Sequence, residues 1–350
     1  MKIAYIITSL AQEGPANVVM DLVKVMMAHG HYCKVYYFDT KPNEHTFPCD
    51  TQKITFSESI PFKDFDLVHT HSLRPDIYAF LRKPFFIRTK LICTIHNFVF
   101  QDLISDHGKF KGIIGGIIWQ LSRYRNDRII VLNKSAKRYY SRWFCNKKLR
   151  IAYNTRVLDK SISIPLSDKD IIDNLHQQFN VVCCSICRVT DRKGLNQIVE
   201  ALPQLPKNIC YLIIGDGQGV TKLKELVEKL SLTNRVYFIG NRIDGYRYLP
   251  YIDIFCIPSH SEGFPLAMLE AASYGKAIIS SDIKVFKEIF TEEEIMICQE
   301  NDIDSFVSGF LKLIPQIELF GAKAKARFES DYSPEAFYKN HINIYNEVLK

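Results

Sequence analysis

Apolar and polar residues alternate along this chain in blocks that recur in the same order. A short apolar run, a polar loop and a segment with apolar residues at helical spacing follow one another, which predicts a strand, a loop and a helix. The predicted strands of the first half are residues 2–7, 32–38, 66–70, 90–95, 128–132 and 150–152. Those of the second half are residues 181–186, 209–214, 236–239, 254–257, 277–280 and 295–298. This alternation predicts the α/β class with parallel sheets.

Helical spacing follows most of the predicted strands, and one polar stretch interrupts the pattern. The predicted helices are residues 17–29, from 75, near 113–123, near 135–144, from 194, 221–230, 265–274 and 334–349. The polar residues 154–170 indicate a linker. Since 350 residues exceed the usual size of one domain, we predict two Rossmann-like, doubly wound domains, residues 1–160 and 161–333. Two such domains facing each other leave a central cleft between the carboxyl edges of their sheets.

The composition is that of a folded globular protein, with 47% hydrophobic and 24% charged residues. The longest uncharged apolar run, residues 112–121, is about half as long as a bilayer crossing requires. The first predicted strand is too short to be a signal peptide, so we expect a cytoplasmic protein. The ten cysteines lie mostly in apolar runs, which favours reduced, buried thiols. Cys184 and Cys187 point to opposite faces of a strand, so we expect neither a disulfide nor zinc there.

Positive charge gathers in residues 111–150, which hold eleven Lys or Arg and one acid, Asp127. This segment therefore carries +10, whereas the whole chain carries +7. It also contains both tryptophans of the protein. Basic, aromatic helices suit an anionic membrane surface. Solvated helix faces or nucleic-acid binding would give the same composition. We expect membrane contact and no nucleic acid, and the predicted contact residues are Trp119, Arg123, Arg138, Arg142, Trp143, Lys147 and Lys148.

Two acids in the second half suggest a site for hydroxyl groups. Glu262 lies in the loop after the predicted strand 254–257, and Glu270 lies in the helix that follows. The carboxyl edge of a parallel sheet is where open α/β folds bind ligands. Carboxylates there accept charge-assisted hydrogen bonds from sugar or ribose hydroxyls. The alternative is that Glu262 only favours the helix N-terminus and that Glu270 is a solvated helix residue.

Two cations, Arg188 and Lys193, follow the predicted strand 181–186 immediately before a helix predicted to start at Gly194. Cations beside a helix N-terminus suit a diphosphate, although a solvated basic loop would look the same. The turn Gly215-Asp216-Gly217-Gln218-Gly219 is a weaker signal, because it lacks the full dinucleotide fingerprint.

His96 ends the predicted strand 90–95, and a polar ring at that end of a strand faces the ligand side of the sheet. His69 and His71 share one face of their strand and with His96 offer an alternative three-histidine metal site. No carboxylate or cysteine completes an obvious metal shell. We therefore expect no metal and no cofactor.

The second half also resembles a known family. Glu262-Gly263-Phe264-Pro265, seven residues between the two glutamates, and Ala-Ala-Ser-Tyr-Gly-Lys after Glu270 resemble the donor-binding signature of the retaining glycosyltransferases of family 4, which have the GT-B fold. Arg188, Lys193 and Gly194 match the family's G-R-x-x-x-x-K-G motif, with Cys187 in place of the first glycine. The resemblance implies that Arg188 and Lys193 hold the donor diphosphate, that Glu262 orients the sugar and that Glu270 binds the ribose.

The resemblance also implies roles in the first half. The family's histidine at the position of His96 contacts the transferred sugar, and Gly14 matches a glycine that lies against the diphosphate. Glu13 departs from the pattern, because a carboxylate there would repel phosphate. The final helix, residues 334–350, is expected to pack back on the first domain. The full set implied for donor binding is Gly14, Arg188, Lys193, Gly215, Gly217, Asn241, Glu262, Gly263, Phe264, Pro265, Leu266 and Glu270.

The resemblance implies a retaining, metal-independent hexosyltransferase. It would move a sugar from a nucleotide-diphosphate donor, bound by the second domain, to a saccharide acceptor, bound by the first. A lipid-linked acceptor, in bacterial surface polysaccharide assembly such as O-antigen or capsule, would place the enzyme peripherally on the inner face of the plasma membrane. Three alternatives remain open: a nucleotide-sugar epimerase of the same fold, a nicotinamide-dependent oxidoreductase, and a catalytically silent scaffold.

Overall fold

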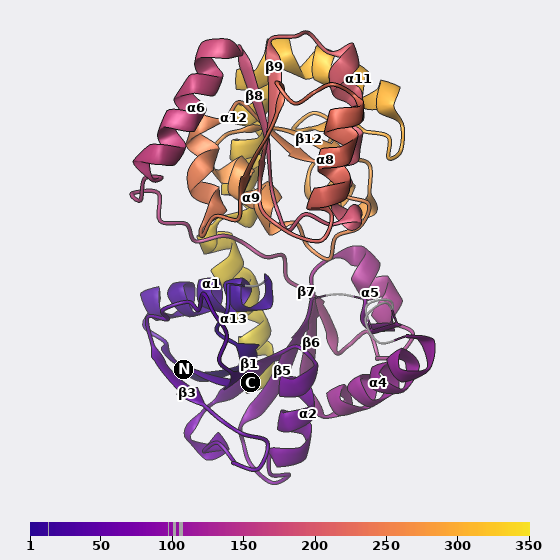
Figure 1. Cartoon of the computed structure of the whole chain (residues 1–350). Coiled ribbons are helices and arrows are strands. Elements are labelled where there is room, and N and C mark those ends of the chain that lie inside the picture. The colour runs from indigo at the N-terminus through magenta and orange to yellow at the C-terminus, as the bar shows by residue number, and fades with distance from the viewer. Residues whose placement is uncertain (13, 97, 101–102, 105–107) are drawn as a thin grey trace. The chain divides into compact units, whose positions relative to one another are not determined.

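The protein consists of two α/β units, each with its own parallel sheet (Figure 1). In the structure, a computed structural model, residues 1–12, 14–96, 98–100, 103–104 and 108–350 are described. Unit 1 comprises Met1–Val157 and Tyr332–Lys350, and unit 2 comprises Leu158–Asp331. The chain passes between units within a few residues of the predicted boundaries at 160 and 333. The predicted α/β class with two parallel, Rossmann-like halves is confirmed.

The sheet of unit 1 has seven strands in the order β3-β2-β1-β4-β5-β6-β7, all parallel. They are β1 (Lys2–Ser9), β2 (Tyr32–Asp39), β3 (Asp50–Lys53), β4 (Leu67–His71), β5 (Lys90–Ile95), β6 (Arg128–Val131) and β7 (Leu149–Ile151). The apolar pattern predicted every strand except β3. All four residues of β3, Asp-Thr-Gln-Lys, are exposed at the sheet edge, so this strand carries no apolar signal.

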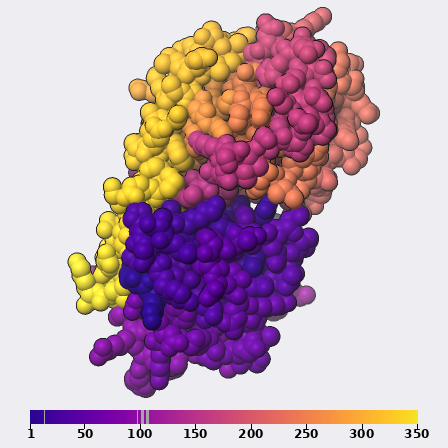
Figure 2. Space-filling model, turned by 90° about the vertical axis from the view of Figure 1, so that its left-hand side faces the viewer, coloured from indigo at the N-terminus to yellow at the C-terminus, as the bar shows by residue number. Residues whose placement is uncertain are grey.

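Helices cover both faces of this sheet. They are α1 (Gly14–Ala28), α2 (Leu73–Arg82), α4 (Lys109–Ser122), α5 (Lys134–Tyr140) and the final helix α13 (Pro334–Leu349). Helix α13 packs on α1 and belongs to unit 1. Its Tyr345 hydroxyl lies 2.8 Å from Nδ1 of His69, and its Glu347 pairs with Arg128 and Arg150. In the space-filling view the yellow end of the chain lies beside indigo residues of the same unit (Figure 2).

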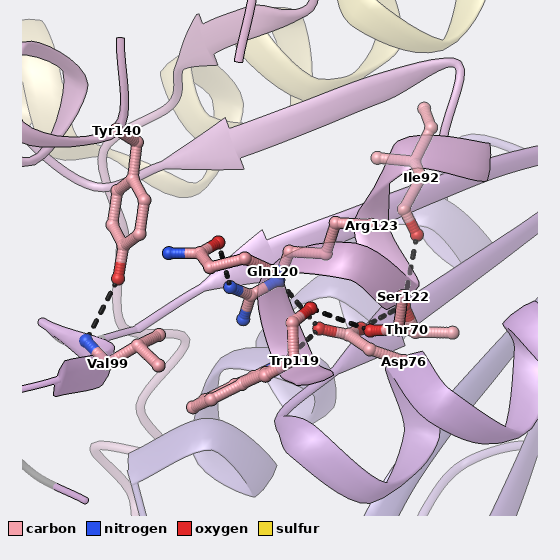
Figure 3. A network of polar contacts seen from close by, with 9 residues as sticks. All are labelled: Thr70, Asp76, Ile92, Val99, Trp119, Gln120, Ser122, Arg123 and Tyr140. Atoms are coloured by element: carbon pink, nitrogen blue, oxygen red, sulfur yellow. Dashed lines mark hydrogen bonds and ion pairs between the residues drawn. The ribbon is translucent and has the colours of Figure 1, made fainter. Parts of the chain in front are cut away.

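A buried polar network joins α4 to α2 and β4 (Figure 3). The Asp76 carboxylate accepts hydrogen bonds from Nε1 of Trp119 at 2.6 Å, from Nε of Arg123 at 3.0 Å and from the Thr70 hydroxyl at 2.6 Å. The Arg123 guanidinium also stacks over the Trp119 ring at 4.1 Å. Arg123 is fully buried and Trp119 is 5% exposed. The prediction that these two residues touch a membrane is therefore wrong: their polar groups are used inside the unit.

The sheet of unit 2 has six parallel strands in the order β10-β9-β8-β11-β12-β13. They are β8 (Val181–Ile186), β9 (Ile209–Ile214), β10 (Val236–Gly240), β11 (Ile254–Ile257), β12 (Ala277–Ser281) and β13 (Met296–Cys298). Counted within the unit, this is the order 3-2-1-4-5-6 of a dinucleotide-binding sheet. The strands before β11 add to one side of β8 and those from β11 onward add to the other, so the strand order reverses between β8 and β11 and the loops after these two strands are neighbours at the carboxyl edge.

The helices of unit 2 are α6 (Leu166–Gln178), α7 (Asn196–Ala201), α8 (Val220–Lys229), α9 (Leu266–Ser273), α10 (Lys284–Ile289), α11 (Ile303–Leu313) and α12 (Ile317–Arg327). Helix α6 begins inside the predicted linker, directly after Pro165, and Asp168 in its first turn binds Arg242. Helix α9 begins one residue after Pro265, whose carbonyl accepts from the backbone of Met268.

Candidate active site

The loops after β8 and β11 meet through a group of charged side chains. Nζ of Lys193 lies 2.6 Å from the Glu262 carboxylate. The Ser259 hydroxyl donates to the same carboxylate oxygen at 2.8 Å, and the Arg192 guanidinium lies 3.4 Å from the other oxygen. The Glu262 side chain is only 8% exposed and that of Lys193 18%. Two residues predicted as separate contacts for sugar and diphosphate thus form one ion pair at the point where the strand order reverses.

Gly194 allows these two loops to approach each other closely. Its φ is +62°, and a Cβ atom there would lie 2.2 Å from the carbonyl oxygen of Pro258. The buried Gln197 then links the loops, because its amide donates to the same Pro258 carbonyl at 2.7 Å. A side chain at position 194 would push the Lys193 loop away from the Glu262 loop.

The predicted helix N-terminus at Gly194 is displaced. Asp191–Lys193 form a short 3-10 turn, Gly194 ends it in the left-handed conformation, and α7 starts only at Asn196 and has six residues. The anion-binding contribution of a long helix starting at Gly194 is therefore absent, and the side-chain cations supply the local positive charge. Arg188, two residues after β8, is exposed and forms no hydrogen bond or ion pair within the described residues.

The turn that contains Gly215 and Gly217 packs directly on the loop after β8. Both glycines have positive φ, and Cβ atoms there would lie 1.8 Å from the Cys187 carbonyl oxygen and 2.3 Å from that of Val189. The backbone of Val189 donates to the Asp216 carbonyl at 2.9 Å. The glycines are required for this contact between two backbones, independently of any part they have in ligand binding.

The other predicted donor residues lie at the same carboxyl edge. Gly263, Phe264, Pro265 and Leu266 form the turn from the Glu262 loop into α9, and Glu270 is half-buried one turn into that helix. Asn241 directly follows β10 and is exposed. The neighbouring Arg242 holds Asp168 with two hydrogen bonds at 2.6 and 2.9 Å. This pair ties α6 to the end of β10.

Sequence patterns missed several members of this site. Arg192 and Ser259 both hold the Glu262 carboxylate, and Nδ1 of His260 lies 2.6 Å from the Glu300 carboxylate in the loop after β13. Ser259 three residues before Glu262 is a local signal that was available. The contact between His260 and Glu300 has no such local signal, since it depends on how β12 and β13 pair. A groove of about 650 Å³ runs beside this site between α7 and α8, with Arg192 and His260 among its lining residues.

In unit 1, His96 follows β5 and its half-buried ring contacts the buried His71. Nε2 of His96 lies 2.9 Å from Nδ1 of His71. Both ring nitrogens of His69 lie in hydrogen bonds of 2.8 Å, one to Tyr345 and one to Thr94. The described part of the chain contains no group of three or more histidine, cysteine or acidic side chains arranged to hold a metal ion. Its cysteines are free, Cys184 and Cys187 included.

Gly14 is the first residue of α1 and has open space where a Cβ atom would lie. Glu13, which departs from the family pattern, lies outside the described residues.

Helix α4 turns its apolar side outward. Trp119, Gln120 and Ser122 face inward, together with two glycines. The outward residues follow one helical face and are between 38% and 79% exposed: Phe110, Ile113, Ile114, Ile117, Ile118 and Leu121. Of the predicted membrane residues, Trp143 is 40% exposed, Arg138, Arg142 and Lys147 are exposed, and Lys148 is half-buried. In the described residues, no helix combines the length and the apolar composition needed to span a bilayer.

Comparisons with known proteins identify the family. The model of the glycosyl transferases group 1 matches residues 168–319, and the model of Glycosyltransferase Family 4 matches residues 13–159. The O-antigen biosynthesis glycosyltransferase WclY of Escherichia coli is 30% identical over 368 positions that cover the whole of both chains. The chain belongs to glycosyltransferase family 4. For this family 4 glycosyltransferase, the predicted resemblance is confirmed, and transfer is favoured over the epimerase and oxidoreductase alternatives.

One further relative and one solved structure are similar to this chain. One is the UDP-Gal:alpha-D-GlcNAc-diphosphoundecaprenol alpha-1,3-galactosyltransferase of Escherichia coli, 25% identical over 259 positions, with 71% of this chain and 66% of that protein covered. The other is the crystal structure of HepE of Anabaena in complex with UDP. It matches with a TM-score of 0.80 at 16% identity and covers 99% of this chain and 100% of HepE. The fold of this glycosyltransferase is therefore of the GT-B class.

Proposed function

We propose that this glycosyltransferase moves a sugar from a nucleotide-diphosphate donor to a lipid-linked saccharide, with retention of configuration and without a metal, in bacterial surface polysaccharide synthesis. The observation that carries the proposal is the Lys193–Glu262 ion pair at the strand reversal of unit 2. It places a cation and a hydroxyl acceptor side by side, as a sugar diphosphate requires. The relatives named for O-antigen synthesis and for a diphosphoundecaprenol acceptor support the choice of pathway and acceptor.

In this proposal unit 2 binds the donor. Arg188 and Lys193 hold the diphosphate, Glu262 binds hydroxyls of the sugar, and Glu270 binds the ribose. The turns at Gly215, Gly217, Asn241 and Gly263 to Leu266 surround the nucleotide, and the family resemblance implies that Gly14 contacts the diphosphate.

The hard step is the departure of the nucleoside diphosphate, because negative charge grows on its outer phosphate as the bond to the sugar breaks. The Lys193 ammonium, held by Glu262, and the Arg188 guanidinium would lower this barrier where water is excluded. Lys193 is held by Glu262 before the donor binds, so its position needs little rearrangement. In same-face substitution the departing phosphate itself accepts the proton of the acceptor hydroxyl. The proposal therefore requires no general base from the chain.

Unit 1 would bind the acceptor, and His96 would contact the transferred sugar. The apolar outer face of α4 would enter the anionic inner surface of the plasma membrane, where the lipid-linked acceptor lies. The exposed apolar side chains of α4 suit the acyl chains of such a surface, and the exposed bases Arg138, Arg142 and Lys147 of the same unit suit its anionic headgroups. This would make the protein cytoplasmic and peripheral.

A transfer assay tests the function directly. The purified protein is incubated with a panel of UDP-, GDP- and ADP-sugars and with an N-acetylglucosamine-diphosphoprenol acceptor, and products are analysed by mass spectrometry. We expect a lipid-linked disaccharide from one donor, formed in EDTA, whose new linkage has the donor's anomeric configuration by NMR. An isomeric sugar nucleotide in the arm without acceptor would contradict transfer and indicate an epimerase.

A further inference from the structure

The end of β4 and the end of β5 bring two histidines into direct contact. His71 is the last residue of β4 and is fully buried, whereas His96 follows β5 and is half-buried. Nδ1 of His71 and Nε2 of His96 are 2.9 Å apart, a hydrogen-bond distance. Within the described residues this is the one hydrogen bond of the His96 ring, so its Nδ1 has no partner there.

The rings are neutral at physiological pH. Burial lowers the pKa of His96 to about 3, with a smaller contribution from the positive charge of Arg123. Burial also lowers the pKa of His71 well below 6.5, and the neighbouring His69 and His96 lower it further. Between two neutral imidazoles, one nitrogen has to donate the hydrogen bond and the other has to accept it.

The surroundings of His71 decide which ring donates. Nε2 of His71 is buried and has no hydrogen-bond partner among the described residues. If Nδ1 of His71 accepted the bond, its proton would sit on Nε2 as a buried N–H without an acceptor. Orphaned buried N–H groups are rarer in proteins than buried acceptors that lack a donor. The proton of His71 is therefore on Nδ1, and His71 is the donor.

Neighbouring aromatic rings fix the position of the His71 ring. The His69 ring packs against it with centroids 4.3 Å apart, and the Tyr5 ring lies 6.4 Å away. His69 cannot turn without breaking its hydrogen bonds to Tyr345 of α13 and to Thr94 of β5. No carboxylate is among these contacts, so nothing in this cluster favours a charged ring.

We infer that His71 is a positioning residue that holds His96 in the tautomer with its proton on Nδ1. His96 then presents a neutral N–H donor, and the nitrogen that would serve as a base is occupied by His71. Given the proposed function, this N–H would donate to an oxygen of the transferred sugar. The inference deepens that function, since it assigns His96 to hydrogen bonding and excludes it as a general base.

Ring nitrogen NMR on the full-length chain labelled with ¹⁵N-histidine tests the tautomer without any substrate. The His96→Asn variant assigns the signals of His96 by their loss. At pH 7 we expect a protonated Nδ1 and a bare Nε2 for His96. A protonated Nε2, or an imidazolium ring, would overturn the inference.

Activity tests the consequence. His71→Leu removes the donor, and His71→Asn keeps an amide N–H near the place of Nδ1. We expect kcat to fall about 10- to 100-fold in His71→Leu, the range found for hydrogen-bond partners that orient metal-binding histidines, with the donor KM little changed. His71→Asn should recover part of this loss. Equal loss in both variants, with His96 still protonated on Nδ1, would show a packing role instead. Full activity of His96→Ala would instead remove the proposed role of His96 and leave the NMR result standing.

Discussion

Nζ of Lys193 lies 2.6 Å from the carboxylate of Glu262, and both side chains are mostly buried at the strand reversal of unit 2. The ammonium has three protons, so it can keep one hydrogen bond to Glu262 and still donate to a phosphate oxygen. Glu262 likewise has further acceptor capacity for a sugar hydroxyl. The ion pair thus orients both groups before the donor binds. The stability of unit 2 should therefore depend on both side chains.

Replacing Lys193 with Met should destabilise unit 2 by about 1–3 kcal/mol, because the Glu262 carboxylate loses a partner while it stays buried. Thermal unfolding measures this as a lower Tm, about 2–4 °C for each kcal/mol. Lys193→Met combined with Glu262→Gln should recover part of the loss, since no buried charge is then left unpaired.

The matched control for this variant is Arg188→Met. Arg188 is exposed, so its loss should change stability by less than about 0.5 kcal/mol, yet it should weaken the binding of nucleoside diphosphate. If both variants lowered the Tm equally, the ion pair would have no special role in unit 2.

Glu270→Ala should weaken donor binding by about 1.5–3 kcal/mol, or roughly 10- to 100-fold in Kd, because a charge-assisted hydrogen bond to the ribose is lost. Isothermal titration with the donor found by screening measures the effect. Glu228→Ala on the exposed side of α8 is the control and should bind as the wild type does. Unchanged affinity of Glu270→Ala would remove this residue from the donor site.

Ile114→Glu combined with Ile118→Glu should reduce sedimentation with anionic vesicles at least about tenfold, because each change removes apolar burial and adds a repelled charge. Both side chains are nearly half exposed on the outer face of α4. Ile243→Glu makes the same change at an isoleucine of unit 2 that is 53% exposed, and it should leave sedimentation unaltered. Equal effects of the two changes would argue against membrane contact through α4.

The exposed basic residues of unit 1 predict a dependence on lipid charge. Gln in place of Arg138, Arg142 and Lys147 should weaken binding to phosphatidylglycerol vesicles by about 1 kcal/mol for each charge that lies near the surface. Binding to neutral phosphatidylcholine vesicles should not change. A loss on both vesicle types would mean that the substitutions alter the protein and not its attraction to anionic lipid.

The buried histidines predict acid sensitivity of unit 1. Burial lowers the pKa of His96 to about 3 and of His341 to about 4, and it lowers the pKa of His69 and His71 well below 6.5. As the pH falls below about 6.5, these histidines become protonated in the unfolded chain but stay neutral in the folded unit. The free energy of unfolding therefore falls by up to about 1.4 kcal/mol per pH unit for each histidine. Above that pH these groups contribute no pH dependence.

Thermal unfolding between pH 7.5 and 5 measures this loss. In His341→Gln the decrease of Tm with falling pH below 6.5 should be smaller, by the contribution of one histidine. A Tm that stays constant from pH 7.5 to 5 would contradict the account of the buried cluster.

The sequence predicted most strands, because their apolar residues lie in short uninterrupted runs. It missed β3, whose polar residues lie at an exposed sheet edge, and it placed the start of α7 two residues early, since Gly194 ends a 3-10 turn. The order of strands in each sheet depends on packing between distant segments. The sequence therefore could not reveal that Lys193 and Glu262 form a pair.

The same limit explains the error at α4. Its apolar residues lie at helical spacing, which fits an amphipathic helix that buries its isoleucines and exposes Trp119 and Arg123. Asp76, 47 positions before Arg123, reverses that assignment by binding both side chains inside the unit. A single buried acid far away in the sequence thus decides which face of α4 is exposed.

A crystal structure with the nucleoside diphosphate that gives the largest thermal shift tests the central claim most directly. The account predicts diphosphate oxygens within about 3 Å of the Arg188 and Lys193 side chains, at hydrogen-bond distance. It also predicts the ribose hydroxyls beside Glu270. A nucleotide bound elsewhere, with the Lys193–Glu262 pair unoccupied, would contradict it.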